Sequence, residues 1–221
     1  KNIRWSWRAE QFADHLIKTR LQTRPSSTGK KAITVHYVKI PMEKDHLHIR
    51  ARKYRQHVET YAGQYRVSKN LIFAVIKTES DFNPWAISPA PAFGLMQIVP
   101  SSAGHDVNRY LKRPGLPTEE LLLDPAENIR YGSVFLHILD THYLAAVTNR
   151  VSREYCVIAA YNTGAGNVLK TFDNNRDKAP DKINRLTPLE VYQTLKADLP
   201  HGETRRYLTK VMSAKKEFVN F

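Results

Sequence analysis

The spacing of hydrophobic residues changes within the first 42 residues and predicts a helix followed by a β-strand. Residues 5–23 carry isolated apolar positions among charges, which predicts an amphipathic helix ended by the turn-forming residues 25–29. Residues 31–42 alternate with a period of two, which predicts a β-strand. The sequence offers no convincing second strand, so we expect this one to pair with a segment outside the chain or with another molecule.

From residue 45 onward, apolar positions recur every three or four residues, which predicts a mainly helical remainder. Asp45 is placed to cap a long helix that reaches Tyr65. Its tyrosines repeat at helical spacing, so we expect them in the core rather than on a ligand-stacking surface. Residues 85–100 are rich in Pro and Ala and lack periodicity, which predicts a loop that forms one wall of a cleft.

Later helices begin with recognisable capping sequences. Residues 124–127 and 187–190 each combine an N-cap residue, a proline and a glutamate three positions after the cap. Asp124 and Glu127 are therefore expected to be structural rather than catalytic. Ser152 is expected to open the helix that precedes the glycines near residue 165.

The strongest chemical signal lies between Leu71 and Gln97. Residues 71–76 are apolar all round and predict a core helix, with Ser68 as its N-cap. Three bulky hydrophobes precede Glu79 by three, four and seven positions: Ile76, Val75 and Ile72. A carboxyl group on that face should have a raised pKa, as a general acid requires. Periodicity alone equally allows Glu79 to face water from the last helical turn.

Composition narrows the class of protein. The 221 residues carry a formal net charge of +13, and 42% of them are hydrophobic, so the chain is globular rather than disordered. This basic balance suits a polyanionic partner, either nucleic acid or a cell-wall polymer with free carboxylates. A solvated basic surface without a partner explains the charge equally well.

The single cysteine, Cys156, lies in an apolar run and is expected to be a buried small hydrophobe. A disulfide within the chain is excluded, and because no Cys/His spacing suits a metal, we expect neither metal nor cofactor. No apolar run is long enough to span a membrane, and the N-terminus lacks a signal-peptide pattern. A first residue of Lys rather than Met suggests a processed or trimmed fragment.

Sets of residues in order along the chain resemble the motifs of lytic transglycosylases with the goose-type lysozyme fold. They are Glu79-Ser80, Asn83-Pro84, Gly94-Leu95-Met96-Gln97 and Ala160-Tyr161-Asn162 with Gly164. Upstream, Ile3-Arg4-Trp5 and Phe12-Ala13-Asp14 are similar to the membrane-bound lytic murein transglycosylase C group.

The resemblance implies a mainly α, lysozyme-like (goose-type, SLT) catalytic domain over residues 45–221. It makes residues 1–44 the helix-plus-strand remnant of an N-terminal α/β domain and a linker, with the boundary between Pro41 and Asp45.

The resemblance also implies a peptidoglycan lyase that cleaves the MurNAc-β-1,4-GlcNAc bond without water and leaves 1,6-anhydro-MurNAc ends. Glu79 would act first as acid and then as base, and Tyr207 matches a late tyrosine that faces it. Ser80 would orient the region around Glu79. The residues that would line the sugar subsites are Met96, Gln97, Tyr161 and Asn162. The residues alone favour Met96 as core filler and Gln97 as a helix-start amide.

Counting carboxylates bears on the type of reaction. Hydrolytic glycosidases usually need two, whereas Glu79 has no evident partner in the sequence. Asp81 is too close along the chain, and Asp124 and Glu203 have cap or surface explanations. A lone acid fits the anhydro-forming reaction. A hydrolytic lysozyme of the goose type and a non-catalytic basic module for glycan or nucleic acid stay open as alternatives.

Partners and location follow from the resemblance alone. It implies peptidoglycan glycan strands as the substrate, cell-wall synthesis or division proteins as candidate partners, and no nucleic acid. It places the protein at the periplasmic face of the outer membrane of a Gram-negative bacterium. Attachment would use a lipid anchor outside this chain.

Overall fold

The computed structural model describes residues 6–28, 31–40 and 45–221 of the chain. Two expectations from the sequence lie outside these described residues. They are the similarity at residues 3–5 and the domain boundary at residues 41–44.

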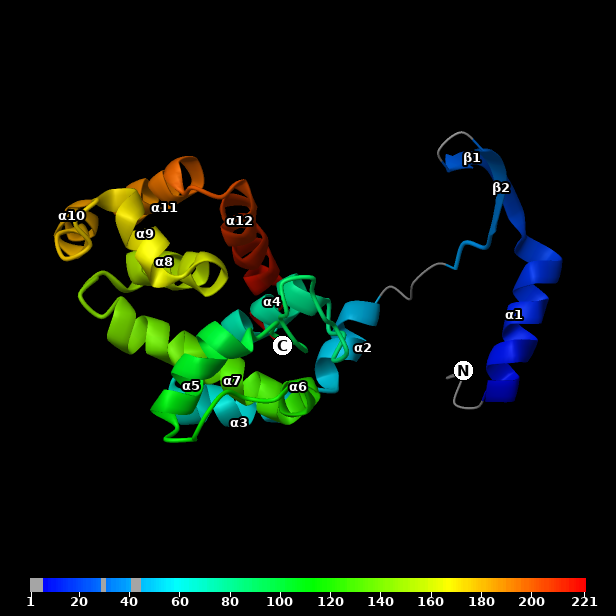
Figure 1. Ribbon diagram of the computed structural model, residues 1–221, viewed down its shortest axis with the longest axis horizontal. Helices are drawn as coiled ribbons and strands as arrows, with labels where there is room; N and C mark the ends of the chain where they lie inside the picture. The colour runs from blue at the N-terminus through cyan, green and yellow to red at the C-terminus, as the bar shows by residue number, and fades with distance from the viewer. Residues whose placement is uncertain (1–5, 29–30, 41–44) are drawn as a thin grey trace. The chain divides into compact units, whose positions relative to one another are not determined.

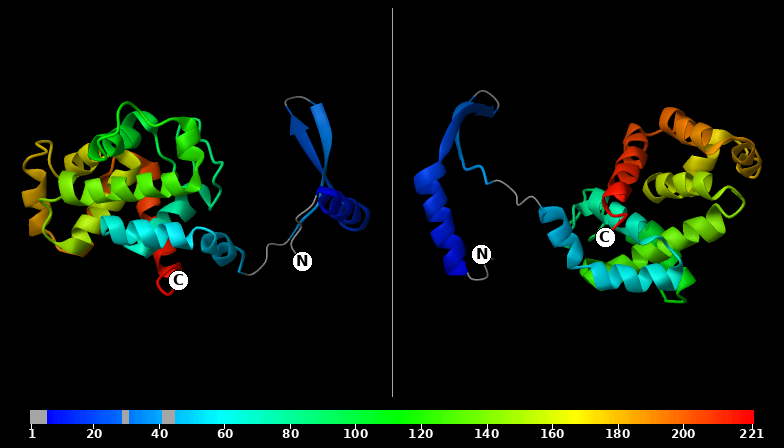
Figure 2. Two further views of the ribbon diagram at one scale, coloured as in Figure 1. Left: turned by 90° about the horizontal axis from the view of Figure 1, so that it is seen from below. Right: turned by 180° about the vertical axis from the view of Figure 1, so that it is seen from behind.

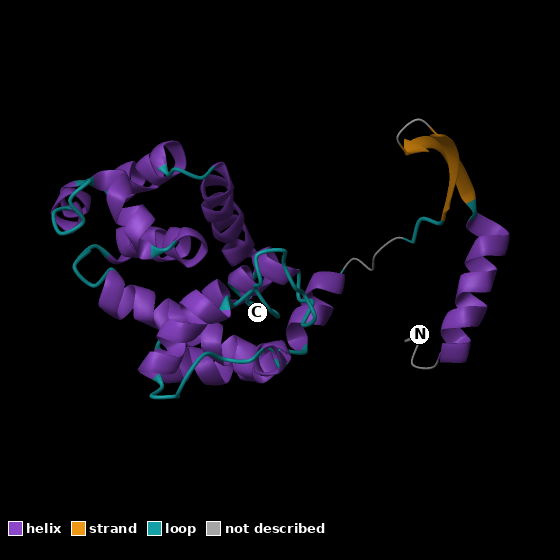
Figure 3. Ribbon diagram, in the orientation of Figure 1, coloured by secondary structure: helices purple, strands orange, loops and turns teal. Residues whose placement is uncertain are grey.

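Helices dominate the chain, as the sequence predicts (Figure 1). The chain divides into two compact units, Lys1–Leu47 and His48–Phe221. In the part of the chain that the structure describes, strands occur in the first unit alone (Figure 3).

The first unit contains helix α1 (Ser6–Arg20) and an antiparallel pair of strands, β1 (Gln22–Thr28) and β2 (Lys31–Tyr37). The expectation that the second strand is missing is wrong, because the residues interpreted as a turn after the helix form β1. Pro25 pairs with Thr34 in this ladder. A two-stranded sheet consists of edges, and a strand edge tolerates a residue without an N–H group.

Side chains of the first unit are poorly covered. Leu16 is its buried apolar side chain among the described residues. Trp7 and Ile17, on the same helix, are 51% and 52% exposed, and Ile33 on β2 is 42% exposed. The described part of this unit therefore shows an amphipathic pattern without a developed core.

The second unit is a set of helices packed around α4 (Lys69–Ser80), which contacts α3, α7 and above all α12. Two single π-helical turns, η1 and η2, interrupt the set. The bounds of the other elements are α2 (His46–Arg52), α3 (Arg55–Tyr65), η1 (Pro100–Gly104), α5 (His105–Tyr110), α6 (Glu119–Leu123), α7 (Pro125–Ile138), η2 (Leu139–Tyr143), α8 (Arg150–Thr163), α9 (Ala165–Phe172), α10 (Ala179–Arg185), α11 (Pro188–Asp198) and α12 (Gly202–Glu217).

The apolar run of α4 forms the centre of the core, as predicted. Residues 71–76 are all buried, and Ile72 and Ile76 have no exposed surface. Each large apolar side chain contributes about 1.5–3 kcal/mol when fully buried. The C-terminal residues, red in Figure 2, close over α4, where the Phe73 ring stacks on that of Phe218 at 5.3 Å.

The helix expected from Asp45 to Tyr65 is broken into α2 and α3. Tyr54 leaves the helical conformation, with φ −107° and ψ 1°, and becomes the N-cap residue of α3. Its ring then stacks on that of Phe82, with centroids 6.4 Å apart. The core position expected for the tyrosines is confirmed for Tyr54 and Tyr65, which are buried, whereas Tyr61 is only half-buried.

Ser68 occupies the predicted N-cap position of α4, without a side-chain hydrogen bond to the helix. Among the later helices, two of the three capping predictions are confirmed. The Asp124 side chain accepts a hydrogen bond from the Glu127 N–H, and Thr187 forms a reciprocal capping box with Glu190. The third is wrong by three residues, because α8 is capped by Asn149 rather than Ser152.

Two smaller expectations also have an outcome. Cys156 is fully buried on α8, and burial raises the pKa of its thiol to about 12. Over the described ranges, no helix combines the length and the apolar character that crossing a bilayer would require.

Candidate active site

The end of α4 has an unusual backbone. Asp81 and Phe82 follow the helix with φ of 49° and 64°, both in the left-handed region. Such positions cost about 1–3 kcal/mol each and persist where the surroundings fix them. The Ser80 hydroxyl donates a hydrogen bond to the Leu95 carbonyl at 2.8 Å, so the helix end is tied to the following loop.

That loop carries the motif around Gly94 and is fixed by its backbone. Gly94 has φ 73°, and a Cβ atom there would lie 2.4 Å from the Leu122 carbonyl oxygen. The buried Asn128 amide donates to the Phe93 and Leu122 carbonyl oxygens and accepts from the Met96 N–H. Asn128 was not identified from the sequence, because it reaches the loop from a distant helix.

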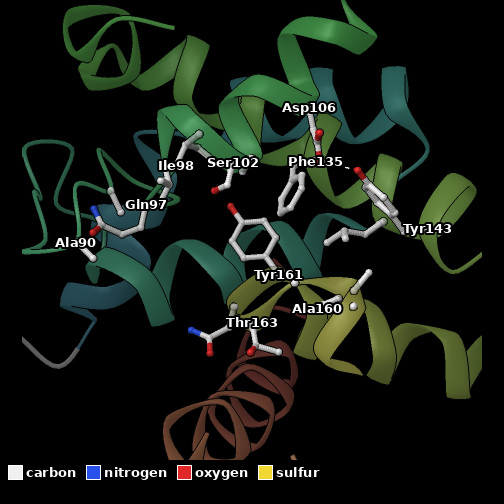
Figure 4. A pocket seen from close by; sticks show the side chains of 18 of the residues that line it. Ala90, Gln97, Ile98, Ser102, Asp106, Phe135, Tyr143, Ala160, Tyr161 and Thr163 are labelled. Carbon is white, nitrogen blue, oxygen red and sulfur yellow. Dashed lines mark hydrogen bonds between the residues drawn. The ribbon is translucent and has the colours of Figure 1, made fainter. Parts of the chain in front are cut away.

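A cavity of about 780 Å³ opens beside Glu79 (Figure 4). Its walls come from the end of α4, the loop after it, the two π-helical turns, the junction of α8 with α9, and the start of α12. Four residues singled out from the sequence line it together: Glu79, Gln97, Tyr161 and Asn162.

The Glu79 carboxyl group has the electrostatics of an acid that works near neutral pH. Burial raises its pKa from 4.5 to about 7. An interaction with the Tyr207 hydroxyl opposes this rise, and the negative charge of Glu203 adds to it. The raised pKa expected from the helical spacing is therefore confirmed.

Two tyrosines face the same carboxyl group. Burial, and then the charge of Glu79, raise the pKa of both Tyr161 and Tyr207 well above the ordinary value of 10. Tyr161 donates its hydroxyl proton to the Met96 carbonyl oxygen at 2.8 Å, and its ring packs 5.4 Å from that of Phe135. The Tyr207 hydroxyl is buried, and no described residue meets strict hydrogen-bond geometry with it.

The amide side chains in the cavity are held by neighbours. Gln97, at φ 48°, donates its amide protons to the carbonyl oxygens of Ala86 and Gly94. The Asn162 side-chain oxygen accepts a hydrogen bond of 2.7 Å from Thr204. Both side chains are therefore held in fixed orientations at the cavity wall.

The Met96 side chain lies away from the cavity. It has no exposed surface and packs so closely on Gly132 that a Cβ atom there would lie 2.2 Å from the sulfur. The position matches the core alternative that the residues alone favour. Met96 contributes to the site through its backbone carbonyl, which fixes Tyr161.

Two further carboxylates line the cavity and were not predicted. Glu203, interpreted from the sequence as a cap or surface residue, is exposed but contributes to the cavity wall. Its spacing of four residues from Tyr207 was the available signal, since both lie on one face of α12. Asp106 lies at another wall, where its carboxylate accepts a hydrogen bond of 2.9 Å from Tyr143 (Figure 4).

The chain matches two family models. Residues 56–184 match the transglycosylase SLT domain, and residues 1–53 match the N-terminal domain of membrane-bound lytic murein transglycosylase C.

Curated relatives cover almost the whole chain. The membrane-bound lytic murein transglycosylase C of Klebsiella pneumoniae is 46% identical over 98% of this chain, and that of Yersinia pestis is 44% identical over 98%. The chain spans 59% of the length of these relatives.

Solved structures agree on the fold over most of the chain. The 70 kDa soluble lytic transglycosylase of Escherichia coli superposes with a TM-score of 0.60 and 26% identity, covering 80% of this chain and 26% of that one. The lytic transglycosylase Slt of Pseudomonas aeruginosa, solved as an inactive mutant, gives a TM-score of 0.55 and 27% identity over 73% of this chain and 23% of that one. The fold is therefore the lysozyme-like helical fold expected from the motifs, and since the SLT model covers more than half of the residues, the chain belongs to the transglycosylase SLT domain family.

Proposed function

We propose that this chain is a peptidoglycan lytic transglycosylase that cleaves the MurNAc-β-1,4-GlcNAc bond and leaves 1,6-anhydro-MurNAc ends. One observation carries the proposal: the Glu79 carboxyl group faces a glycan-sized cavity with a pKa of about 7. At neutral pH such a group is present in both protonation states, so it can give a proton and take one back.

The reaction then needs one carboxyl group and no water. Protonated Glu79 gives its proton to the glycosidic oxygen, the bond from that oxygen to C1 of MurNAc breaks, and GlcNAc leaves as an alcohol. The substrate's own acetamido group supports the positive charge at C1. The Glu79 carboxylate next removes the proton of the C6 hydroxyl, whose oxygen bonds to C1. The ring closes, and Glu79 is protonated again.

The surrounding residues prepare this carboxyl group. Tyr207 would stabilise its ionised form between the two proton transfers, because its hydroxyl interaction lowers the pKa of Glu79. Ser80 would hold the helix end through its bond to Leu95. Gln97 and Asn162 would contact the sugar from fixed orientations, and Tyr161 would present its ring at the cavity wall.

A hydrolytic reaction is the second candidate, and Glu203 is the observation that favours it. Its carboxylate lines the same cavity and acts electrostatically on Glu79. Glycoside hydrolases use a second carboxylate to activate water or to attack the sugar. The two candidates differ in their products, which end in an anhydro ring or in a reducing sugar.

The relatives' names extend the proposal to the substrate and the cellular location of this chain. They describe membrane-bound enzymes of murein, so we propose peptidoglycan strands as the substrate of this chain, in a Gram-negative bacterium. Action at the periplasmic face of the outer membrane, through a lipid anchor outside this chain, belongs to the same proposal, as do cell-wall synthesis or division proteins as partners.

The test is to digest purified peptidoglycan and analyse the soluble products by mass spectrometry. The wild-type protein should release muropeptides lighter by one water than their hydrolysed counterparts, and Glu79→Gln should lower the rate by at least about 10³-fold. The P. aeruginosa structure described as inactive carries a Glu-to-Gln change, which makes this substitution the natural choice. Glu120→Gln, at an exposed position on α6, is the matched control and should keep full activity. Reducing ends would establish the hydrolytic reaction instead.

A further inference from the structure

The end of α4 is held by a residue outside the SLT family match. Arg50 on α2 donates from Nη1 to the Asp81 backbone carbonyl oxygen at 2.6 Å and to the Asp81 carboxylate at 2.7 Å. Asp81 is the second residue after Glu79. The SLT match begins at residue 56, so this contact comes from the segment that matches the N-terminal domain model.

Asp81 ends α4 in an unusual backbone conformation that polar contacts hold. It and Phe82 both have positive φ, which L side chains rarely adopt. Phe82 is held by packing, since it is 4% exposed and its ring lies 6.0 Å from that of Phe218. The Asp81 side chain is 62% exposed, so polar contacts rather than packing hold this residue. Its N–H donates to the Lys77 carbonyl oxygen at 3.1 Å, and Arg50 binds the carbonyl oxygen and the carboxylate of Asp81.

Within the second unit, the part of α2 that carries Arg50 packs on the C-terminal residues. His48, two residues earlier on α2, stacks on Phe221 with ring centroids 5.4 Å apart and meets Phe218 edge-on at 6.2 Å. The Arg50 side chain is 26% exposed, so it is partly desolvated at the contact. Both hydrogen bonds leave one nitrogen of this partly desolvated guanidinium, and hydrogen bonds that involve a charged group are stronger than neutral ones.

We propose that Arg50 is a positioning residue for Glu79. By fixing both the carbonyl and the carboxylate of Asp81, it sets the end of α4 and therefore the direction from which the Glu79 carboxyl group enters the cavity. The inference rests on the proposed function of Glu79 as the acid. It makes the segment before the SLT match part of the catalytic apparatus, although Arg50 does not touch the substrate.

Steady-state kinetics on soluble peptidoglycan oligomers tests this role. Arg50→Ala should lower kcat by about 10- to 100-fold, because a misplacement of about 1 Å has effects of that size. KM should change less than about twofold, since the sugar-contacting side chains stay in place. Arg50→Lys, which keeps the charge without the planar group, should restore part of the turnover. Arg52→Ala, an exposed residue on the same helix, is the matched control and should leave kcat unchanged.

Melting curves measured in parallel separate positioning from folding. The expected result is a lower kcat per folded molecule at a temperature where each variant is fully folded. Asp81→Asn removes the carboxylate but keeps the backbone carbonyl contact, so its kcat should lie between those of wild type and Arg50→Ala. If Arg50→Ala does not fold, Asp81→Asn and Arg50→Lys carry the test.

The results that would overturn the role are distinct from those that would overturn the proposed function. Equal kcat per folded molecule in Arg50→Ala and Arg52→Ala would remove Arg50 from the site. Wild-type protein that releases no anhydro products would refute the proposed function instead.

Discussion

Helices α1 and α4 carry apolar residues in comparable numbers, but their surroundings differ completely. On α1 one described side chain, that of Leu16, is buried, whereas residues 71–76 of α4 are buried on every side. Apolar spacing therefore predicts a helix but does not determine which other elements cover it. The acid chemistry depends on the covering, because desolvation is what raises the pKa of Glu79.

We expect the largest effect on stability when a buried side chain of α4, rather than an exposed one of α1, is shortened. Ile72→Ala on α4 should lower the free energy of unfolding by about 2–5 kcal/mol, since the cavity it leaves is enclosed. Ile17→Ala on α1 should change it by less than about 0.5 kcal/mol, because the side chain is 52% exposed. Urea unfolding followed by circular dichroism measures both. A large loss at Ile17 would mean that α1 is covered in solution.

The second prediction uses the carboxyl group itself. The pKa of Glu79 is about 7 in the folded protein against an ordinary value of 4.5, so unfolding releases a proton between these pH values. Stability therefore falls as pH rises through this window, and above pH 7 the loss reaches about 3 kcal/mol. Glu79→Gln should raise Tm relative to wild type at pH 8 and not at pH 4. Glu10→Gln on α1 is the control. An equal gain in its Tm at pH 8 would show that the effect does not come from the burial of Glu79.

The third prediction concerns the buried hydroxyl that faces the acid. Tyr207→Phe should lower kcat about tenfold with little change in KM, because the hydroxyl stabilises the ionised carboxylate between the two proton transfers. Kinetics on soluble glycan oligomers measures the change. Tyr110→Phe, on α5 and outside the main cavity, is the comparison variant. Identical kinetics in the two variants would exclude Tyr207 from the reaction.

The smallest expected effect is electrostatic. Removing the negative charge in Glu203→Gln should lower the pKa of Glu79, because that charge raises it. The alkaline limb of the pH–rate profile should therefore move to lower pH, since protonated Glu79 is lost earlier as pH rises. A loss of all activity without such a movement would instead indicate that Glu203 takes part in hydrolysis.

Features encoded by neighbouring residues could be predicted from the sequence. The core run of α4, the caps at Asp124 and Thr187, and the raised pKa of Glu79 follow from spacings of three to seven residues. The loop after Pro84 was likewise predicted, since Pro and Gly act on the local backbone.

Features that depend on residues far apart in the sequence could not be predicted from it. Strand β1 lacks the alternation of a strand, and pairing with β2 overrides its turn-like composition. The break between α2 and α3 places Arg50 and Tyr54 against the end of α4, a contact that spacing does not show. Asn128 and Asp106 reach the loop and the cavity from helices far along the chain.

The reaction rate of the buried thiol on α8 reports how often the core opens. Cys156 is the single cysteine of the sequence, and alkylating reagents attack thiolates that they can reach. With a pKa of about 12 and no exposed surface, this group reacts when the helices around it separate. The labelling rate of the wild-type protein therefore reports the free energy needed to separate the helices around Cys156, without an engineered probe.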